Sequence, residues 1–347
     1  MQTNTTRDKT IDFIKGILIL FVILGHTTLG LTDMYSFDDT MNGIANVIYS
    51  FHMPCFIAVS GFLYSEYVGN VSQGIFSRIC HKAFNILLPY VMISVIYWII
   101  KFALSNLIRE PVAVSSLISI PWKPIEFLWY LYALFLIYCV AYMADYVFAR
   151  LLPHFNYKME LLFVLFLIIA LTCYGSFHYE GFNYIAGFQM YFYLGCLIKK
   201  WLDKLDNRYA VLSLAVMSVL VEASGIVLQD DMSSNPIFSS LFERFTACIV
   251  TVFIFAVSYF LSGYCDFPKW LQTIGRDSMP FYAMNVIFVG GIRIILNRAG
   301  ITNMVLQCIC GFAGSTAICW ILYECIIKKI RLIDFIFYPG KQLDVRK

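Results

Sequence analysis

Long apolar stretches recur along the whole chain and constrain its fold more than any other feature. A helix needs roughly 20 mostly apolar residues to cross the hydrocarbon core of a bilayer. Hydrophobic residues make up 60% of the 347 residues and charged residues only 14%, whereas a soluble domain is roughly a quarter charged. We therefore predict an all-α, polytopic transmembrane helix bundle that forms a single membrane domain over residues 1–347, with short cytoplasmic tails. The predicted spans, about ten in number, are 11–31, 42–64, 84–105, 125–148, 159–176, 185–200, 209–228, 243–262, 278–296 and 305–326.

The distribution of lysine and arginine orients this bundle, because short cytoplasmic loops of membrane proteins are enriched in both residues. With the N-terminus inside, only six of the 25 basic residues fall at outer positions, which leaves 19 at inner ones. We therefore predict a multi-pass protein with both ends in the cytoplasm and membrane lipids as its surroundings. The net charge of +3 is too small to suggest a nucleic-acid partner. The six outer basic residues are Lys101, Arg109, Lys123, Arg244, Arg293 and Arg298.

The first predicted helix carries three ionisable residues, Asp12, Lys15 and His26. It lacks the small-x-small cleavage site of a signal peptide, so we interpret it as a membrane helix. At about 100° per residue, the eleven-residue step from Lys15 to His26 is three turns plus ~20°, so both point the same way, roughly 16 Å apart along the axis. Asp12 lies three residues before Lys15, near the same face. Ionisable residues at bilayer depth usually face a cavity or a partner.

This stripe has two interpretations. A cation at the cytoplasmic mouth and an imidazole near mid-membrane suit a cosubstrate that enters from the cytoplasm with its phosphates at the mouth, with His26 as general base. Alternatively, Lys15 extends its ammonium to the membrane interface and His26 hydrogen-bonds a neighbouring helix. From the residues alone, neither interpretation is favoured.

Further polar residues follow along the chain. The second predicted helix contains His52 and, eight residues later, Ser60. After it come Arg78, His81 and Lys82, which would share one face of a helix and could bind phosphates, or could serve as ordinary positive-inside anchors. Trp129 opens the fourth predicted helix.

Several familiar sites are absent from the sequence. The eleven cysteines form no CxxC pair and no zinc-type spacing with histidine, so we predict no metal site. Walker, GxSxG and HExxH motifs are likewise missing.

Six blocks resemble one family in order and spacing. They are RDKTIDFIKGILILFVILGHT, SFHMPCFIAVSGFLYS, the Leu88-Pro89-Tyr90 block after the basic segment, FLWYLYALF, FQMYFYLGCLIKK and IGRDSMPFYAMN. From Arg7 to about Phe288 the chain is similar to the acyltransferase-3 family of membrane O-acyltransferases, which includes sugar O-acetylases of bacterial envelopes. Two positions depart from the family pattern. Asn285 stands where histidine is common, and the partner of Arg78 in the family's arginine pair is His81 or Lys82.

The resemblance implies a multi-pass enzyme of the inner (cytoplasmic) membrane that transfers an acyl group, most often acetyl, from cytoplasmic acyl-CoA to a hydroxyl of a cell-envelope glycan or lipid-linked sugar. Acetyl-CoA is then a cosubstrate, and no cofactor is bound permanently. We expect His26 to be the catalytic base. The expected donor-binding residues are Lys15, Arg78 and Lys82, and the expected supporting or acceptor-binding residues are Asp12, His52, Ser60 and Trp129.

Two other classes of function remain open at this point, and a homo-oligomer is compatible with each. A transporter or flippase of a lipid-linked sugar would also need buried polar residues, although the sequence has no matched pair of broken helices in two halves. A membrane scaffold without catalysis would make the placement of Lys15 and His26 accidental. Consumption of acyl-CoA with a glycan acceptor separates the first function from the other two.

Overall fold

The computed structural model describes residues 8–32, 39–67, 74–103, 114–152, 154–205, 207–227 and 235–340. All eight residues proposed for the site fall within these ranges. The residues of the charge count and of the family blocks that lie outside the described residues are Arg7, Arg109, Lys341, Arg346 and Lys347.

Every regular element in the described ranges is a helix, and no strand occurs among them, which confirms the predicted all-α class. The chain divides into two compact units. The first comprises Met1–Ser65 and Leu194–Glu324, and the second comprises Glu66–Tyr193 and Cys325–Lys347. The prediction of a single membrane domain stays a prediction.

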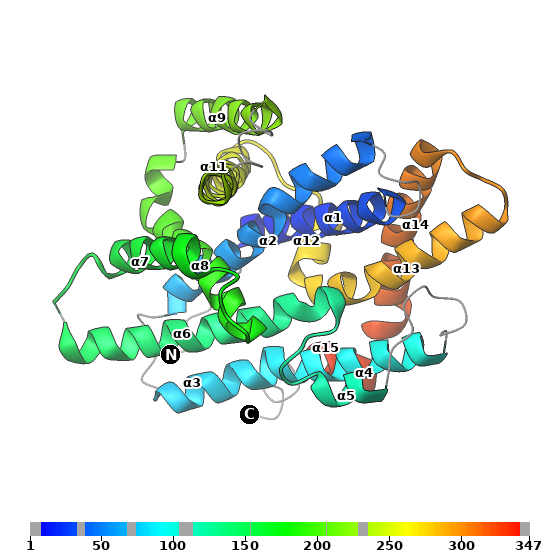
Figure 1. The fold of residues 1–347 in the computed structure, drawn as a ribbon, viewed down its shortest axis with the longest axis horizontal. Helices are drawn as coiled ribbons and strands as arrows, with labels where there is room; N and C mark the ends of the chain where they lie inside the picture. The colour runs from blue at the N-terminus through cyan, green and yellow to red at the C-terminus, as the bar shows by residue number, and fades with distance from the viewer. Residues whose placement is uncertain are drawn as a thin grey trace. The chain divides into compact units, whose positions relative to one another are not determined.

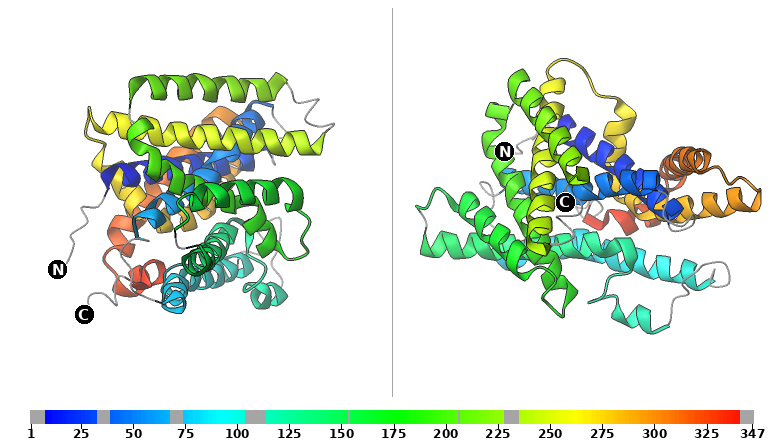
Figure 2. Two further views of the ribbon diagram at one scale, coloured as in Figure 1. Left: turned by 90° about the vertical axis from the view of Figure 1, so that its left-hand side faces the viewer. Right: turned by 45° about the horizontal axis from the view of Figure 1, so that its top comes forward.

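The first unit is organised around α1. This helix packs against α11, α12, α13 and α14, and α9 lies beside α11 in each view (Figures 1 and 2). The helices of this unit are α1 (Lys9–Thr32), most of α2 (Asp39–Tyr67), the end of α8 (Glu180–Leu205), α9 (Arg208–Val227), α11 (Pro236–Ser262), α12 (Lys269–Arg276), α13 (Ser278–Arg298) and α14 (Met304–Leu322).

The second unit contains a long, nearly continuous helical segment from Ile75 to Ala103 that packs along α6. The short helix α15 packs against α4, and its Phe335 ring meets the ring of Phe84 in η2. Two π-helical turns, η2 and η4, follow α3 and α14. The elements of this unit are α3 (Ile75–Lys82), η2 (Ala83–Leu87), α4 (Leu88–Ala103), α5 (Val114–Ser119), η3 (Glu126–Leu128), α6 (Trp129–Leu151), α7 (Lys158–Cys173), the first part of α8 and α15 (Arg331–Phe337), with η4 (Tyr323–Ile327) at the junction between the units.

The segment that carries Arg78 and Lys82 lies before the predicted span 84–105 and is helical as well. It forms α3 and runs through η2 directly into α4, so that both cations lie on a helix. Pro89 explains the wide π turn before it: proline has no backbone N–H, and its ring pushes away the carbonyl four residues upstream. Hydropathy alone predicts a span that begins near residue 84, because the helical turns before it are amphipathic.

Eight helices in the described residues are long and apolar enough to cross a membrane. They correspond to eight of the ten predicted spans. The remaining two predicted spans form α7, which has only 16 residues, and part of α8. The eight are Lys9–Thr32, Thr40–Ser65, Ile75–Ala103, Trp129–Leu151, Arg208–Gly225, Pro236–Ser262, Ser278–Arg298 and Met304–Ile327.

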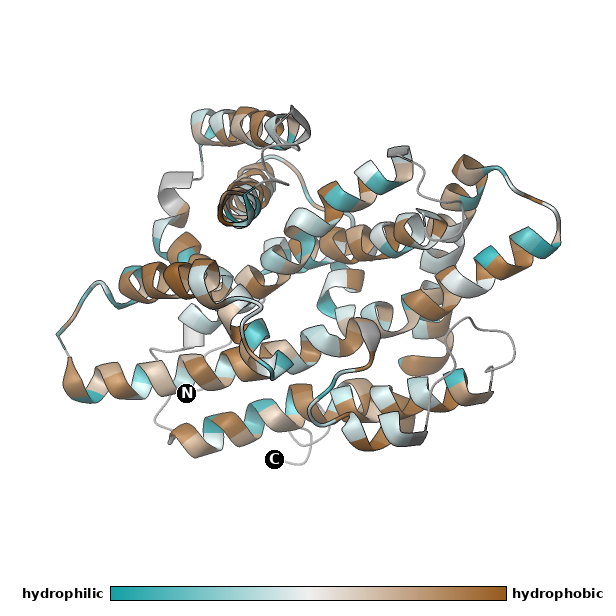
Figure 3. Ribbon diagram, in the orientation of Figure 1, coloured by the Kyte–Doolittle hydropathy of each residue, from teal (hydrophilic) through white to brown (hydrophobic). Residues whose placement is uncertain are grey.

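Apolar side chains cover the outer sides of these helices as well as their contacts. Helix α9 is apolar enough to span a membrane, yet only 6% of the residues in its most apolar 18-residue stretch are buried within the chain. Leu220 on this helix is 62% exposed. In Figure 3 the hydrophobic colour dominates the visible turns of α7 and α11. Such surfaces are stable where lipid, rather than water, covers them.

Glycines allow α1 to contact α12 backbone to backbone. A Cβ atom built on Gly275 would lie 1.7 Å from the carbonyl oxygen of Asp12, and one on Gly16 would lie 2.2 Å from that of Leu271. Both distances are far inside van der Waals contact, so only glycine fits at either position. The stacked rings of Phe13 and Phe267 extend the same interface. This contact fixes α1 at the turn that carries Lys15.

Candidate active site

Three ring side chains, those of His26, Tyr49 and His52, form a cluster in the first unit. The Tyr49 hydroxyl lies 3.2 Å from Nδ1 of His26, and the two rings meet edge to face. The Tyr49 ring also meets the ring of His52 edge to face, at 4.8 Å between centroids. Helix α1 therefore supplies one histidine and α2 supplies the tyrosine and the second histidine, three residues apart on one face.

His52 is held in one tautomer by its own helix. Its Nδ1 lies 2.7 Å from the carbonyl oxygen of Ile48. Because a carbonyl only accepts, Nδ1 carries the proton and donates it, which leaves the Nε2 lone pair available. His52 is 3% exposed, so this arrangement is protected from bulk water.

Lys15 and Asp12 lie on the same uninterrupted helix as His26. Because α1 runs from Lys9 to Thr32 without a break, the predicted common face and the separation of roughly 16 Å between Lys15 and His26 hold along it. Asp12 is 6% exposed, and Lys15 is half-buried. Asp8 caps the start of α1 by accepting from the backbone of Thr10 at 2.8 Å.

A second polar group lies at the end of α12, next to this part of α1. Arg276 donates from Nε to the Asp277 carboxylate at 2.8 Å, and the Tyr323 hydroxyl donates to the same oxygen at 2.6 Å. The hydrogen bond to Asp277 raises the pKa of the Arg276 guanidinium, so the side chain is a permanent cation. Its side chain is 43% exposed, whereas that of Asp277 is 5% exposed. The sequence interpretation did not assign these residues, although the block IGRDSMPFYAMN contains both charges.

Arg78 and Lys82 lie in the second unit, over two tyrosines of α6. The guanidinium carbon of Arg78 is 4.2 Å from the ring centroid of Tyr142, and Lys82 Nζ is 3.8 Å from that of Tyr138. The predicted common face is thus matched by a four-residue spacing of the aromatic rings. Asp145, one turn further along α6, lies 4.0 Å from Arg78. Its closer partner is Lys158, at 2.6 Å.

The other two predicted supporting residues are held in helix contacts. The Ser60 hydroxyl donates to the carbonyl of Phe56, one turn back on α2, at 3.2 Å. Trp129 in the second unit packs its ring on Tyr184 and Phe188 of α8, at 5.2 and 5.1 Å between centroids. These contacts hold both side chains in place by packing within their own units.

Asn285, where the family often has histidine, faces its own helix. Its side chain is buried, and its amide nitrogen donates to the carbonyls of Phe281 and Tyr282 at 3.0 and 2.7 Å. Ser315 of α14 donates to the backbone carbonyl of Asn285 at 3.2 Å. The backbone of Asn285 therefore joins α13 to α14.

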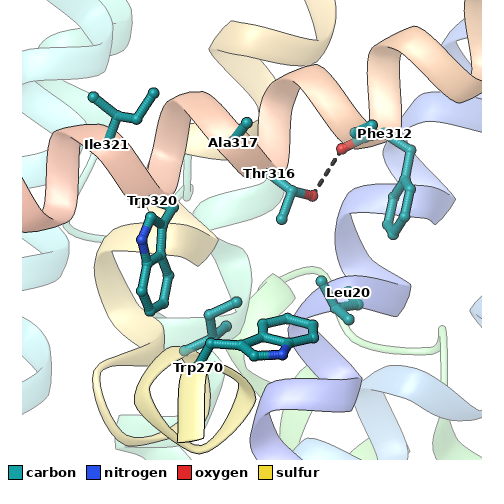
Figure 4. A pocket seen from close by; sticks show the side chains of 9 residues that line it. Leu20, Trp270, Phe312, Thr316, Ala317, Trp320 and Ile321 are labelled. Atoms are coloured by element: carbon teal, nitrogen blue, oxygen red, sulfur yellow. Dashed lines mark hydrogen bonds between the residues drawn. The ribbon is translucent and has the colours of Figure 1, made fainter. Parts of the chain in front are cut away.

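An apolar pocket of about 520 Å³ lies between α1, α12 and α14. Figure 4 shows the rings of Trp270 and Trp320 and the side chains of Leu20 and Phe312 around this space. The hydroxyl of Thr316 is already bonded to the carbonyl of Phe312, at 2.7 Å. The lining thus offers hydrophobic contact rather than polar recognition. Within the described ranges, no group of three His, Cys, Asp or Glu side chains could hold a metal ion.

Comparison with known proteins adds a family and two relatives. Residues 8–324 match the family described as "Acyltransferase domain". A nodulation protein NolL of Mesorhizobium japonicum is 30% identical over 157 residues, which are 44% of this chain and 38% of that protein. NolL of Sinorhizobium fredii is 38% identical over 84 residues, which are 24% of this chain and 22% of that protein. The matches thus span less than half the length of each relative. No solved structure matches the chain.

Proposed function

This chain belongs to the acyltransferase family whose domain covers residues 8–324, and from that premise we propose that it is a multi-pass membrane enzyme that transfers an acyl group to a glycan hydroxyl. The acceptor we propose is a cell-envelope glycan or a lipid-linked sugar, and the donor is cytoplasmic acyl-CoA, with acetyl-CoA as the first candidate. The observation that carries the proposal is an oriented imidazole, His26, on the same helix as Lys15.

In this reaction His26 is the general base. It takes the proton of the acceptor hydroxyl as that oxygen attacks the thioester carbonyl. The new C–O bond forms, the C–S bond breaks, and the proton passes from the imidazolium to the departing thiolate of coenzyme A. General-base assistance contributes about 10²–10⁴-fold in rate. His52, neutral and beside Tyr49, supports the polar environment of this step.

Three basic residues are proposed to bind the phosphates of the donor. Lys15 lies on the His26 face of α1, and Arg78 and Lys82 share one face of α3. Coenzyme A carries several negative charges, and charge-assisted hydrogen bonds are the strong ones available to bind them. Lys15→Ala and Arg78→Ala should raise the Michaelis constant for the donor and leave that for the acceptor nearly unchanged. Lys15→Arg should retain most activity, and Lys15→Glu should be worse than Lys15→Ala.

The deciding experiment uses the purified full chain in nanodiscs, with acetyl-CoA and envelope glycans as substrates. We expect release of free coenzyme A together with a mass increase of one acetyl group on the glycan. His26→Ala should abolish both, whereas His154→Ala, a change of an exposed histidine, should not. Normal turnover in a folded His26→Ala protein would remove His26 from the mechanism. Failure of every acyl-CoA tested with the wild-type protein would count against the donor.

The orientation is proposed from the basic residues and is tested separately. On a cysteine-depleted background, single cysteines at residues 5 and 75 should be shielded from an impermeant thiol reagent in intact cells. A cysteine at residue 38 should react. The reverse labelling pattern would place the donor-binding cations on the wrong side of the inner membrane.

A further inference from the structure

We propose that Tyr49 is a positioning residue that determines which ring nitrogen of His26 acts as the base, an inference that rests on the proposed function of His26. Three contacts carry it: the 3.2 Å approach of the Tyr49 hydroxyl to His26 Nδ1, the edge-to-face packing of Tyr49 on His52, and the close passage of Tyr49 over Gly25.

The path of α1 past α2 places Tyr49 against the backbone of α1. A Cβ atom on Gly25 would lie 3.2 Å from Cε2 of Tyr49 and 3.1 Å from Cγ2 of Ile48. The missing side chain at Gly25 lets the phenol ring lie beside the helix and reach His26, the next residue. Gly25 therefore makes room for Tyr49, which contacts the adjacent His26.

The other side of the Tyr49 ring is fixed by His52. That histidine is tied to the carbonyl of Ile48 and is 3% exposed, so its own ring cannot turn without breaking a buried hydrogen bond. Tyr49, which is 38% exposed, thus contacts the backbone of α1 on one side and the oriented imidazole of His52 on the other. A partner held on both sides in this way fixes the ring plane of His26, and a reacting group needs such support from its neighbours.

The chemistry follows from the hydrogen-bonding capacity of the two groups. A neutral imidazole donates from one nitrogen and accepts at the other, and a phenol can do either. In the reactive arrangement, Nδ1–H of His26 donates to the Tyr49 oxygen, and Nε2 faces the acceptor hydroxyl with its lone pair. When Nε2 takes the proton, Nδ1 keeps the same bond, which now stabilises an imidazolium. Tyr49 gains and loses no proton, so it acts through His26.

Tyr49→Phe tests the inference, because it removes the hydroxyl and keeps the ring against Gly25 and His52. Hydrogen bonds to charged groups are worth more than neutral ones, so we expect kcat to fall about 10- to 100-fold. The Michaelis constants for donor and acceptor should not change. In a His26→Ala background the same substitution should cause no further loss. Tyr264→Phe, at a 76% exposed tyrosine of the same unit, is the matched control and should leave kcat unchanged.

Restoring the hydroxyl distinguishes positioning from packing. 3-Fluorotyrosine incorporated at residue 49 returns the O–H to the same ring and should recover most of the lost kcat, whereas Tyr49→Leu should not. Wild-type kcat in Tyr49→Phe, while His26→Ala is inactive, would overturn this role of Tyr49 and leave the proposed function intact. Activity in His26→Ala would instead overturn the base assignment itself.

Discussion

The polar residues of the two units are held in place by different kinds of partner. In the first unit, His26 and His52 are oriented by a hydroxyl and a backbone carbonyl, which are neutral partners. In the second unit, the basic side chains of Arg78 and Lys82 lie over the faces of Tyr142 and Tyr138. Oriented neutral imidazoles suit proton transfer, because one ring nitrogen keeps a lone pair that can accept a proton. Cations over aromatic rings are held in place by the ring face, and their positive charge suits the binding of an anion.

Residues that act on the same substrate can therefore need different surroundings. A base is useless if its ring turns, so its neighbours are close and directional. A phosphate-binding cation needs only a stable side-chain position and its charge. The consequences differ in size, and four experiments examine them.

The largest effect is expected from His26. His26→Ala removes the base, so kcat for acyl transfer should fall about 10²–10⁴-fold with little change in donor affinity. Turnover and donor saturation curves in nanodiscs measure both constants. A rise in the donor Michaelis constant with unchanged kcat would mean that the first unit binds the donor rather than moves a proton, which would break the comparison.

The paired change Arg78→Ala with Lys82→Ala is expected to act on binding. Charge-assisted hydrogen bonds are worth about 1.5–3 kcal/mol, so the donor Michaelis constant should rise about 10- to 100-fold while kcat is nearly retained. Arg150→Ala is the matched control, because Arg150 also lies over a tyrosine of α6, Tyr146, at 4.5 Å. Equal effects of the pair and of Arg150 would indicate general electrostatics rather than a specific phosphate site.

A smaller effect is expected from the ring beneath Arg78. Tyr142→Leu keeps an apolar side chain but removes the π face, a contribution of at least about 0.5–1 kcal/mol, because Tyr142 is buried. We expect the donor Michaelis constant to rise about two- to fivefold, and Tyr146→Leu to have no such effect. An unchanged constant in Tyr142→Leu would show that Asp145, not the ring, holds the guanidinium.

The smallest effect concerns how α1 is held. Gly275→Ala forces a Cβ atom onto the Asp12 carbonyl, and overpacking of this kind costs about 1–3 kcal/mol, so the melting temperature in detergent should fall by a few degrees. Gly290→Ala, within α13, meets no atom within 4 Å and should leave the melting temperature unchanged or raise it, because alanine favours a helix. Equal melting temperatures for the two variants would mean that α1 and α12 separate without cost.

The sequence by itself determined the helical class, the spans of most helices and the common face of Lys15 and His26. The physical reason is that lipid forces apolar length and internal hydrogen bonding onto every crossing segment, and helical periodicity then places residues eleven apart together. The common face of Arg78 and Lys82 could be predicted from their four-residue spacing for the same reason. The π turn that joins their helix to α4 could not be predicted, because the amphipathic turns before Pro89 carry no apolar signal.

Only the tertiary structure decided which residues meet across helices. Tyr49 reaches His26 because α2 passes α1 at Gly25, and Arg276 and Tyr323 meet at the Asp277 carboxylate because the end of α14 lies near the end of α12. Such contacts depend on where helices cross, and crossings depend on the sum of many weak packing contacts and on the places where glycine lets backbones touch. Periodicity along one helix contains no information about them. The identity of His26 as a candidate could therefore be inferred from one helix, while the tyrosine that orients it could be found only from two.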